Sequence, residues 1–503
     1  MPDAVATQAV SPSSTEHGLK REISWWDGVV ITACMPGFIL PSIGFSVSLL
    51  GGWGSVALWL GVVTFGFLMA NFYSELAAMF PHRTGGIATY IDEAVHKISR
   101  IPAVISAYGY WFGYSAVLSI NGILVGSYIQ AAWLTSVHVT VAGQDIFAPL
   151  VGTAMLILLW AVAISGIRPT VGITYALGIL TVLPLLIVGI APWVTGHMHL
   201  ENLNNTTFPG GGTPVAIFSF AGLGIFLAMW YLGGWSAYAV ESAAAFTPEY
   251  KNPKREVPMA LRRAGLIQIV LFAIIPLSLV GTVGQDKIVQ APYVAFVPVL
   301  QTLFGGVGTA IVLIMLISSL ILSALISTAD GGRALYQLAR DGLTIKWLSH
   351  LNKRQVPDNG MTWDLGIQTV IMWIPYAAGM IGFGFLATNA PIVILAVSNL
   401  GYILCHVLAI GAYLILRYRR PDLARPFKLG TAWIPLAWFL LGFNILIIFL
   451  GAANPSLGYG IGPFLLGVVV LLISVVLYFV RRNIEEPRTG AKPPVTPVMA
   501  GRV

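Results

Sequence analysis

Long apolar segments constrain the fold of this chain more than any other feature. An α-helix needs about 20 mostly apolar residues to cross the roughly 30 Å hydrocarbon core of a bilayer. Twelve such segments follow one another along the 503 residues. A helix satisfies its own backbone hydrogen bonds inside lipid, and these segments are too long for barrel strands. We therefore predict an all-α integral membrane protein with twelve spans, over 26–50, 54–80, 102–135, 147–166, 170–195, 214–246, 260–283, 304–332, 364–386, 390–417, 431–452 and 460–481.

Charged residues are scarce, which argues against the soluble classes of protein. They make up 9% of the chain, whereas a soluble domain carries about 25%. The connections between the predicted spans are short, so we expect one membrane domain over 25–483. A disordered tail is expected at 1–24 and a second tail at 484–503. Cofactors and metal sites are not expected, and the two cysteines lack metal or redox spacing.

The basic residues lie almost entirely on one side of the predicted membrane. When the twelve spans are threaded in alternation, all of the 27 Lys and Arg except Lys287 fall on the same side. Loops rich in Lys and Arg face the cytoplasm, so both termini are expected there. This orientation accounts for the net charge of +7 without a nucleic-acid partner. The Ala/Gly/Val-rich, lysine-poor composition favours a bacterial inner membrane as the plasma membrane concerned.

Two spans are interrupted at about half their depth. The first contains Met35-Pro36-Gly37, with Pro41 shortly after it, and the sixth contains Gly233-Gly234-Trp235-Ser236. Proline removes a backbone donor and glycine tolerates unwound backbone. Interrupted segments at corresponding places in two halves point to a transporter site, where half-helix N-termini could meet an anionic group. Kinks that serve only helix packing are the alternative, but a separation of five spans suggests a five-plus-five inverted repeat.

Three motifs, in order along the chain, support this interpretation. Glu-Leu-Ala-Ala-Met-Phe-Pro occupies 75–81, Trp-Ser-Ala-Tyr-Ala-Val-Glu occupies 235–241 and runs into Lys-Asn-Pro at 251–253, and Gly-Arg-Ala-Leu-Tyr opens the stretch 332–343. Together they resemble the signatures of the amino acid–polyamine–organocation transporters, over essentially the whole chain. The resemblance implies a LeuT-like fold with repeats at 25–195 and 214–417 and two further helices at 431–481. It also implies secondary active transport of amino acids or related small amines by alternating access.

The resemblance further implies where the substrate binds. The unwound part of the first span and the strip after Trp235 would face the site, together with the Tyr-Trp stretch of the third span. Tyr110 and Glu241 would form an inner gate. Phe38 and Ile39 replace small residues of the family and Ala239 replaces a glycine, so the site would be tighter or would meet a carboxylate differently. The candidate substrate-binding residues are Met35, Pro36, Gly37, Phe38, Ile39, Gly113, Tyr114, Trp235, Ser236, Ala237, Tyr238 and Ala239.

Glu241 is the only acidic residue well inside a predicted span. A carboxylate at membrane depth costs several kcal/mol, so such a residue is a functional candidate. We expect Glu241 to hold a substrate cation, to accept a coupling proton, or to do both in turn; a structural hydrogen-bond acceptor is the alternative. Glu75 is expected to pair with a loop arginine, and His406 to be a hydrogen-bonded packing residue.

The mode of coupling stays open at this point. Residues 170–195 contain no lysine, whereas some family members carry one there in place of a sodium ion, so an exchanger or a proton-coupled transporter is favoured. Sodium held by hydroxyls of Ser319, Ser323, Ser327 and Thr328 is the less favoured alternative. No cluster of residues typical of a membrane enzyme is evident, and a nutrient sensor or channel is the alternative of a different class. The expected partners are a small amino acid or amine substrate and the lipid bilayer, with a homodimer left open.

Overall fold

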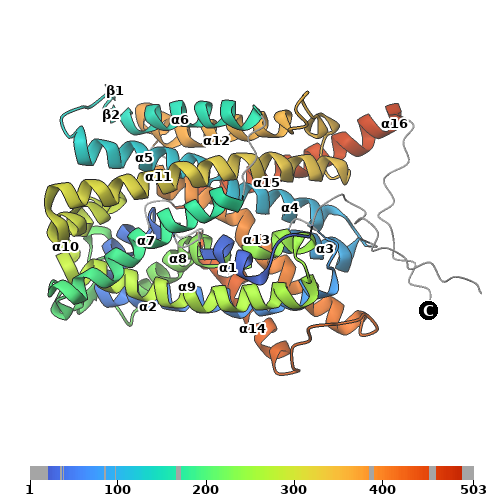
Figure 1. Ribbon diagram of the computed structural model, residues 1–503, viewed down its shortest axis with the longest axis horizontal. Helices are drawn as coiled ribbons and strands as arrows, with labels where there is room; N and C mark the ends of the chain where they lie inside the picture. Colours follow the sequence, from blue (N-terminus) through green and yellow to red (C-terminus); the bar gives the residue numbers. More distant parts are fainter. Residues whose placement is uncertain are drawn as a thin grey trace, which may run out of the picture.

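Long α-helices that run side by side make up the molecule (Figure 1). This computed structural model describes residues 21–33, 37, 39–83, 86–96, 98–165, 171–383, 390–452 and 460–489. Within this part of the chain, ten helices are long and apolar enough to cross a membrane. The prediction of an all-α membrane protein is confirmed, whereas the count of twelve spans stays a prediction.

The helices of the first half follow the predicted spans closely. Gly51 interrupts the helical geometry of α2 with a φ of 69° and a ψ of −164°, a backbone conformation that glycine adopts readily. This kink lies between the predicted spans 26–50 and 54–80, so one continuous element contains the boundary between them. The elements are α1 (Trp25–Ala33), α2 (Ile43–Met79), α3 (Ile87–Val95), α4 (Ile101–Ser115), α5 (Val117–Trp133), α6 (Phe147–Ile164) and α7 (Val171–Thr195).

The second half has a similar series of helices. The principal ones are α8 (Phe220–Ala237), the 3₁₀ segment η4 (Ala239–Glu249), α9 (Pro253–Val283), α11 (Phe296–Arg340), α12 (Asp358–Met380), α13 (Ala390–Arg419), α14 (Trp433–Leu446) with the π-helical η7 (Ile447–Ala452), and α15 (Ile461–Val480). Neither α12 nor the nine-residue α1 is among the ten candidate spans.

Short elements connect these helices. Two antiparallel hairpins, β1 with β2 and β3 with β4, lie in loops. The short elements are β1 (Thr140–Val141), β2 (Gln144–Asp145), η2 (Leu200–Leu203), β3 (Thr207–Phe208), η3 (Gly210–Gly212), β4 (Val215–Ala216), α10 (Gln285–Gln290), η5 (Pro292–Val294), η6 (Lys346–Ser349), η9 (Arg481–Glu485) and α16 (Glu486–Thr489).

The disordered tail predicted at 1–24 has backbone structure at its last residues, and the second tail stays a prediction. Ile23 forms a parallel bridge with Tyr250. The N–H of Ile23 donates to the carbonyl of Glu249 at 3.0 Å, and the N–H of Lys251 donates to the carbonyl of Ile23 at 2.9 Å. Residues 22–24 are therefore ordered, because backbone groups next to η4 pair with them. At the other end, helical structure continues beyond residue 483 through α16. The remaining tail residues lie outside the described part.

The core of the bundle forms around α13, α8 and α4 with α5. In α13, 89% of the most apolar stretch is buried, and in α8 with η4 the share is 83%. In α14 with η7 and in α15 the share is 33%, the lowest among the ten candidate spans. The helices that the resemblance places outside the two repeats are thus the least buried of the ten candidate spans.

A buried cluster of charged side chains joins the end of α2 to the end of α13 and to the segment that follows it. Glu75, at the end of α2, accepts hydrogen bonds from Arg417 Nη2 at 2.6 Å and from the backbone N–H of Leu429 at 2.8 Å. Arg425 Nε lies 3.2 Å from the other carboxylate oxygen, and the three charged side chains are at most 7% exposed. The expected pairing of Glu75 with a loop arginine is confirmed, and the cluster fixes the segment after α13 to α2.

The first prediction concerns Glu75→Gln. Removing one partner of a buried ion pair leaves uncompensated charge and costs about 3–5 kcal/mol, so this variant is expected to unfold at a clearly lower temperature in detergent. Asp422→Asn is the matched control, because Asp422 pairs with Arg420 nearby at the surface, where its side chain is 63% exposed. A Glu75→Gln protein as stable as the Asp422→Asn protein would contradict the prediction.

Candidate functional site

The first span is interrupted where the sequence predicts. α1 ends at Ala33 and α2 begins at Ile43, and between them the N–H of Leu40 bonds the carbonyl of Gly37 at 3.1 Å. Ser42 Oγ lies 3.4 Å from Ser236 Oγ of α8, and both side chains are fully buried. The interruption therefore contacts the sixth predicted span. Of the candidate residues in this strip, Gly37 and Ile39 are described, whereas Met35, Pro36 and Phe38 lie outside the described residues.

The sixth predicted span is interrupted later than expected. α8 remains helical through Gly233 and Gly234 to Ala237, and the N–H of Tyr238 still bonds the carbonyl of Gly234 at 3.0 Å. The backbone changes to the 3₁₀ segment η4 at Ala239. The interruption predicted at Gly233-Gly234-Trp235-Ser236 is thus wrong, because these four residues are helical. Both glycines are helical and allow close packing instead: Gly234 faces Ile403 of α13, and Gly233 faces Val62 and Trp59 of α2.

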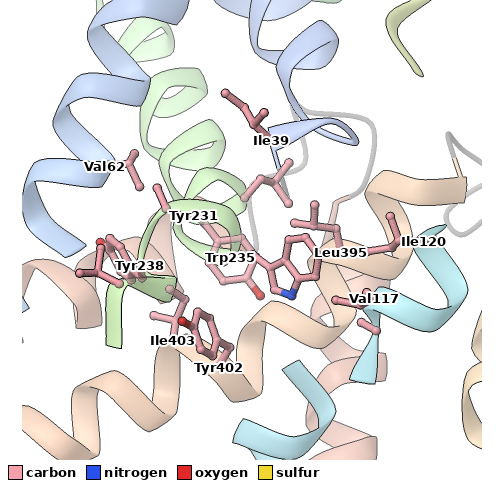
Figure 2. Packing of buried hydrophobic residues seen from close by; sticks show 14 of the residues in the cluster. Ile39, Val62, Val117, Ile120, Tyr231, Trp235, Tyr238, Leu395, Tyr402 and Ile403 are labelled. Atoms are coloured by element: carbon pink, nitrogen blue, oxygen red, sulfur yellow. The ribbon is translucent and has the colours of Figure 1, made fainter. Parts of the chain in front are cut away.

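Trp235 joins α8 to α4. Its indole N–H donates to the carbonyl of Gly113 at 2.7 Å, and its side chain is 3% exposed. This carbonyl is available because α4 ends at Ser115, and the last four carbonyls of a helix lack intrahelical partners. Figure 2 shows the indole directed toward Val117 and Ile120 of α5 and toward Leu395 of α13. Trp235 therefore lies in a packed contact between three helices.

Three tyrosine hydroxyls converge on one oxygen of Glu241. Oε1 accepts hydrogen bonds from Tyr110 at 3.1 Å, Tyr114 at 2.9 Å and Tyr402 at 3.0 Å. Glu241 itself is fully buried. Tyr110 and Tyr114 lie one turn apart on α4 and are half-buried, whereas Tyr402 comes from α13. The predicted pairing of Tyr110 with Glu241 is present, and the structure adds Tyr114 to it.

Tyr402 is a member of this cluster that sequence reasoning missed. It reaches Glu241 because α4 and α13 cross at glycines: a Cβ on Gly109 would lie 2.9 Å from Gly401 Cα, and one on Gly113 would lie 2.8 Å from Tyr402 Cβ. Small residues four apart allow membrane helices to approach closely. The spacing Gly109-x-x-x-Gly113 was therefore the available signal for a close crossing, but it does not identify the partner helix.

No positive charge compensates Glu241 among the described residues. None of the ion pairs found there involves Glu241, and its second oxygen, Oε2, is buried without a hydrogen-bond partner. One oxygen thus has three neutral donors and the other is free. Such a carboxyl group can take up a proton or accept a hydrogen bond from an ammonium group.

His406 lies beside the cluster. Its Nδ1 is 2.7 Å from the hydroxyl of Tyr73, and its ring meets that of Tyr402 edge to face with centroids 4.6 Å apart. His406 is fully buried. The expectation of a hydrogen-bonded packing residue is confirmed.

Asp364 is a third fully buried acidic side chain, after Glu75 and Glu241. Asp364 stands at the first position of the predicted span 364–386, yet α12 begins six residues earlier, at Asp358. Its carboxylate accepts a hydrogen bond from Ser115 of α4. The structure therefore adds a buried acid that the sequence placed at the edge of a span, because helix boundaries are the least certain part of a sequence-based assignment.

The chain belongs to the amino acid permease family, within the amino acid–polyamine–organocation superfamily. The family model described as amino acid permease matches residues 23–484. With its apolar helices, the chain is thus a multi-pass membrane protein of a family of transporters.

Several characterised transporters resemble it. The aspartate-proton symporter of Bacillus subtilis is 24% identical over 408 residues, 78% of this chain and 70% of the symporter. The branched-chain amino acid permease of the same species is 25% identical over 494 residues, 93% of this chain and 95% of the permease. That of Lactococcus lactis is 31% identical over 214 residues, covering 41% of this chain and 42% of the permease.

Tyr402→Phe tests the tyrosine cluster. Loss of one hydrogen bond to a buried carboxyl group costs about 1–3 kcal/mol, so the variant is expected to unfold at a lower temperature than the unmodified protein. Tyr128→Phe is the matched control, because the hydroxyl of Tyr128 is equally buried but has no hydrogen-bond partner among the described residues. Equal unfolding temperatures for the two variants would mean that the bond to Glu241 contributes no stability.

Proposed function

We propose that this protein is a secondary active transporter that moves an amino acid or a related small amine across the cytoplasmic membrane by alternating access. The observation that carries the proposal is the fully buried carboxyl group of Glu241, whose Oε1 accepts hydrogen bonds from three tyrosines. A carboxyl group without a cationic partner in such a place is costly. A functional role in binding a proton or an ammonium group explains why it is kept.

The proposed architecture has twelve spans, with inverted repeats at 25–195 and 214–417 and additional helices at 431–481. The interruption between α1 and α2 and the change from α8 to η4 support two related breaks at mid-depth. The segregation of Lys and Arg supports cytoplasmic termini in a bacterial inner membrane.

The proposed substrate site lies between the first interruption, the end of α8 and α4. Its proposed members among the described residues are Gly37, Ile39, Gly113, Tyr114, Trp235, Ser236, Ala237, Tyr238 and Ala239. Met35, Pro36 and Phe38, which lie outside the described residues, are proposed members as well. Ile39, Trp235, Ser236 and Ala239 are at most 3% exposed, which supports a tight site for a small side chain. Tyr110 and Glu241 are the proposed inner gate.

Proton coupling or exchange fits the contacts better than sodium coupling. The hydroxyl of Ser319 is 2.6 Å from that of Thr181, and Ser323 accepts a hydrogen bond from Asn121 Nδ2 at 2.6 Å. Thr328 donates to the carbonyl of Ala324 at 2.9 Å. The α11 hydroxyls named here thus bond to protein groups, as ordinary packing residues do.

Counterflow in proteoliposomes tests the proposal. Vesicles that contain purified protein are loaded with an unlabelled amino acid or amine and diluted into the labelled compound, without an ion gradient. We expect transient accumulation of at least one compound, starting with aspartate and the branched-chain amino acids. A protein that exchanges none of a panel of amino acids and amines would contradict transport and favour the nutrient sensor, whereas a conductance without counterflow would favour a channel.

Glu241→Gln separates proton coupling from substrate binding. Glutamine keeps a hydrogen-bond acceptor for the three tyrosines but cannot bind and release a proton. We expect uptake driven by a pH gradient to be lost, together with the pH dependence of counterflow. Glu249→Gln is the matched control, because Glu249 lies on the same 3₁₀ segment away from the tyrosines. An unchanged pH profile in Glu241→Gln would remove this residue from the mechanism.

Trp235→Ala tests the position of the substrate. Loss of a buried aromatic contact or of a cation–π pair is expected to weaken substrate binding by more than about 1 kcal/mol, roughly fivefold. Trp373→Ala is the matched control, because Trp373 is a partly buried tryptophan of α12 whose indole N–H donates to Thr153 of α6 at 2.9 Å, outside the proposed site. If both variants bind substrate with the affinity of the unmodified protein in a thermal-shift titration, the substrate binds elsewhere.

A further inference from the structure

A fully buried carboxylate lies on a different side of α4 from Glu241. Asp364 of α12 accepts a hydrogen bond from Ser115 of α4, and its other oxygen, Oδ2, has no partner among the described residues. Gly331 of α11 allows this position, since a Cβ there would overlap Oδ2 and would lie 3.4 Å from the indole nitrogen of Trp111. The carboxylate is thus enclosed by α4, α11 and α12.

Other polar atoms near Asp364 are also buried without partners. In the described part of the chain these include the indole N–H of Trp111 and the amide nitrogen of Gln368. The rings of Tyr108 and Trp111 are 4.7 Å apart, and Gln368 follows Asp364 by one turn of α12. Unpartnered buried polar atoms call for an explanation, and a functional role is one.

The charged side chains on the surrounding helices pair with groups other than Asp364. On α11, Arg333 pairs with Asp330 at 3.1 Å, and both side chains are more than 40% exposed. On α12, Asp358 pairs with His350 at 2.7 Å. The other titratable group facing Asp364 is the hydroxyl of Tyr108 from α4, while the neighbouring part of α5 contributes the uncharged Ser119, which bonds Gln368. Asp364 therefore has no counter-charge in the described part.

The chemistry of the surroundings favours a proton over a metal ion. A hard cation needs several oxygen ligands, whereas the unpartnered indole and amide groups are donors that cannot ligate one. A proton requires one carboxylate oxygen, and Oδ2 is free to take it. The neighbouring donors can stabilise the ionised form after the proton leaves.

α4 connects the two carboxyl groups. Tyr110 and Tyr114 bond Glu241, while the next residue after each, Trp111 and Ser115, faces Asp364. Successive residues of an α-helix point about 100° apart, and residues four apart share a face. Two adjacent faces of one helix therefore serve two separate acidic sites.

We propose that Asp364, with Ser115, is a second proton-binding site, distinct from that of Glu241. The proposal adds a site to the function argued above and does not depend on the identity of the transported substrate.

Infrared difference spectroscopy between acid and alkaline pH tests this on the full-length protein in lipid vesicles. A buried carboxyl group that changes protonation gives a C=O stretching band. We expect one such band to disappear in Asp364→Asn and to persist in Glu241→Gln. Asp358→Asn is the matched control, because Asp358 lies on the first turn of the same helix and outside the proposed site. Thermal unfolding establishes that each variant is folded.

Ser115→Ala gives a second readout if Asp364→Asn does not fold. Loss of the serine hydrogen bond is expected to shift the frequency of the Asp364 band without removing it. A spectrum of Asp364→Asn that matches that of Asp358→Asn would overturn the proposal. So would a Ser115→Ala spectrum without any shifted carboxyl band. Both results are independent of counterflow, so failure of transport and failure of this site are distinguishable.

Discussion

The removal of carboxylates from water is the constraint on which this structure depends. Glu75, Glu241 and Asp364 are each fully buried in an apolar bundle, where an isolated ionised group would cost many kcal/mol. Each has different partners: two arginines for Glu75, three tyrosine hydroxyls for Glu241 and one serine hydroxyl for Asp364. Glu75 forms ion pairs with both arginines, whereas an acid among neutral hydroxyls can hold or release a proton. A buried carboxyl group therefore stabilises a contact between chain segments at Glu75, whereas at Glu241 and Asp364 it is a candidate proton-binding group.

Close helix crossings make the two neutral clusters geometrically feasible. The contact of Gly109 with Gly401 brings α13 against α4, so that the hydroxyl of Tyr402 meets those of Tyr110 and Tyr114 at one oxygen. Gly331 of α11 leaves the space that the carboxylate of Asp364 of α12 occupies. A side chain larger than hydrogen at these points would separate the helices and leave the carboxyl groups without their donors. The polar sites thus depend on packing between backbones.

The sequence predicts features that depend on neighbouring residues, such as apolar helices. It predicts contacts between distant helices less well. Segments of about 20 apolar residues predict helices because lipid requires internal hydrogen bonding, and Glu241 stood out because it interrupts such a segment. Tyr402 was missed because it is 161 residues from Glu241 and only the crossing of α4 and α13 joins them. Asp364 was missed because apolar content defined the start of its span, whereas α12 begins earlier with polar residues. The glycines of α8 were misinterpreted because glycine can either break a helix or allow close packing, and tertiary contacts decide which.

The arrangement of the three tyrosines indicates how Glu241 could exchange a proton or meet a substrate. Tyr402 is 2% exposed and fixed by the glycine crossing, whereas Tyr110 and Tyr114 are half-buried and lie on α4. A movement of α4 away from Glu241 would break the contact of Gly109 with Gly401 and would remove two of the three donors. Loss of two donors favours the protonated carboxyl group over the ionised one, because hydrogen bonds to a carboxylate stabilise its charge. Since Ser115 lies on the same helix, that movement would also change the environment of Asp364. α4 is therefore the helix that supplies hydrogen-bond donors to both buried acids.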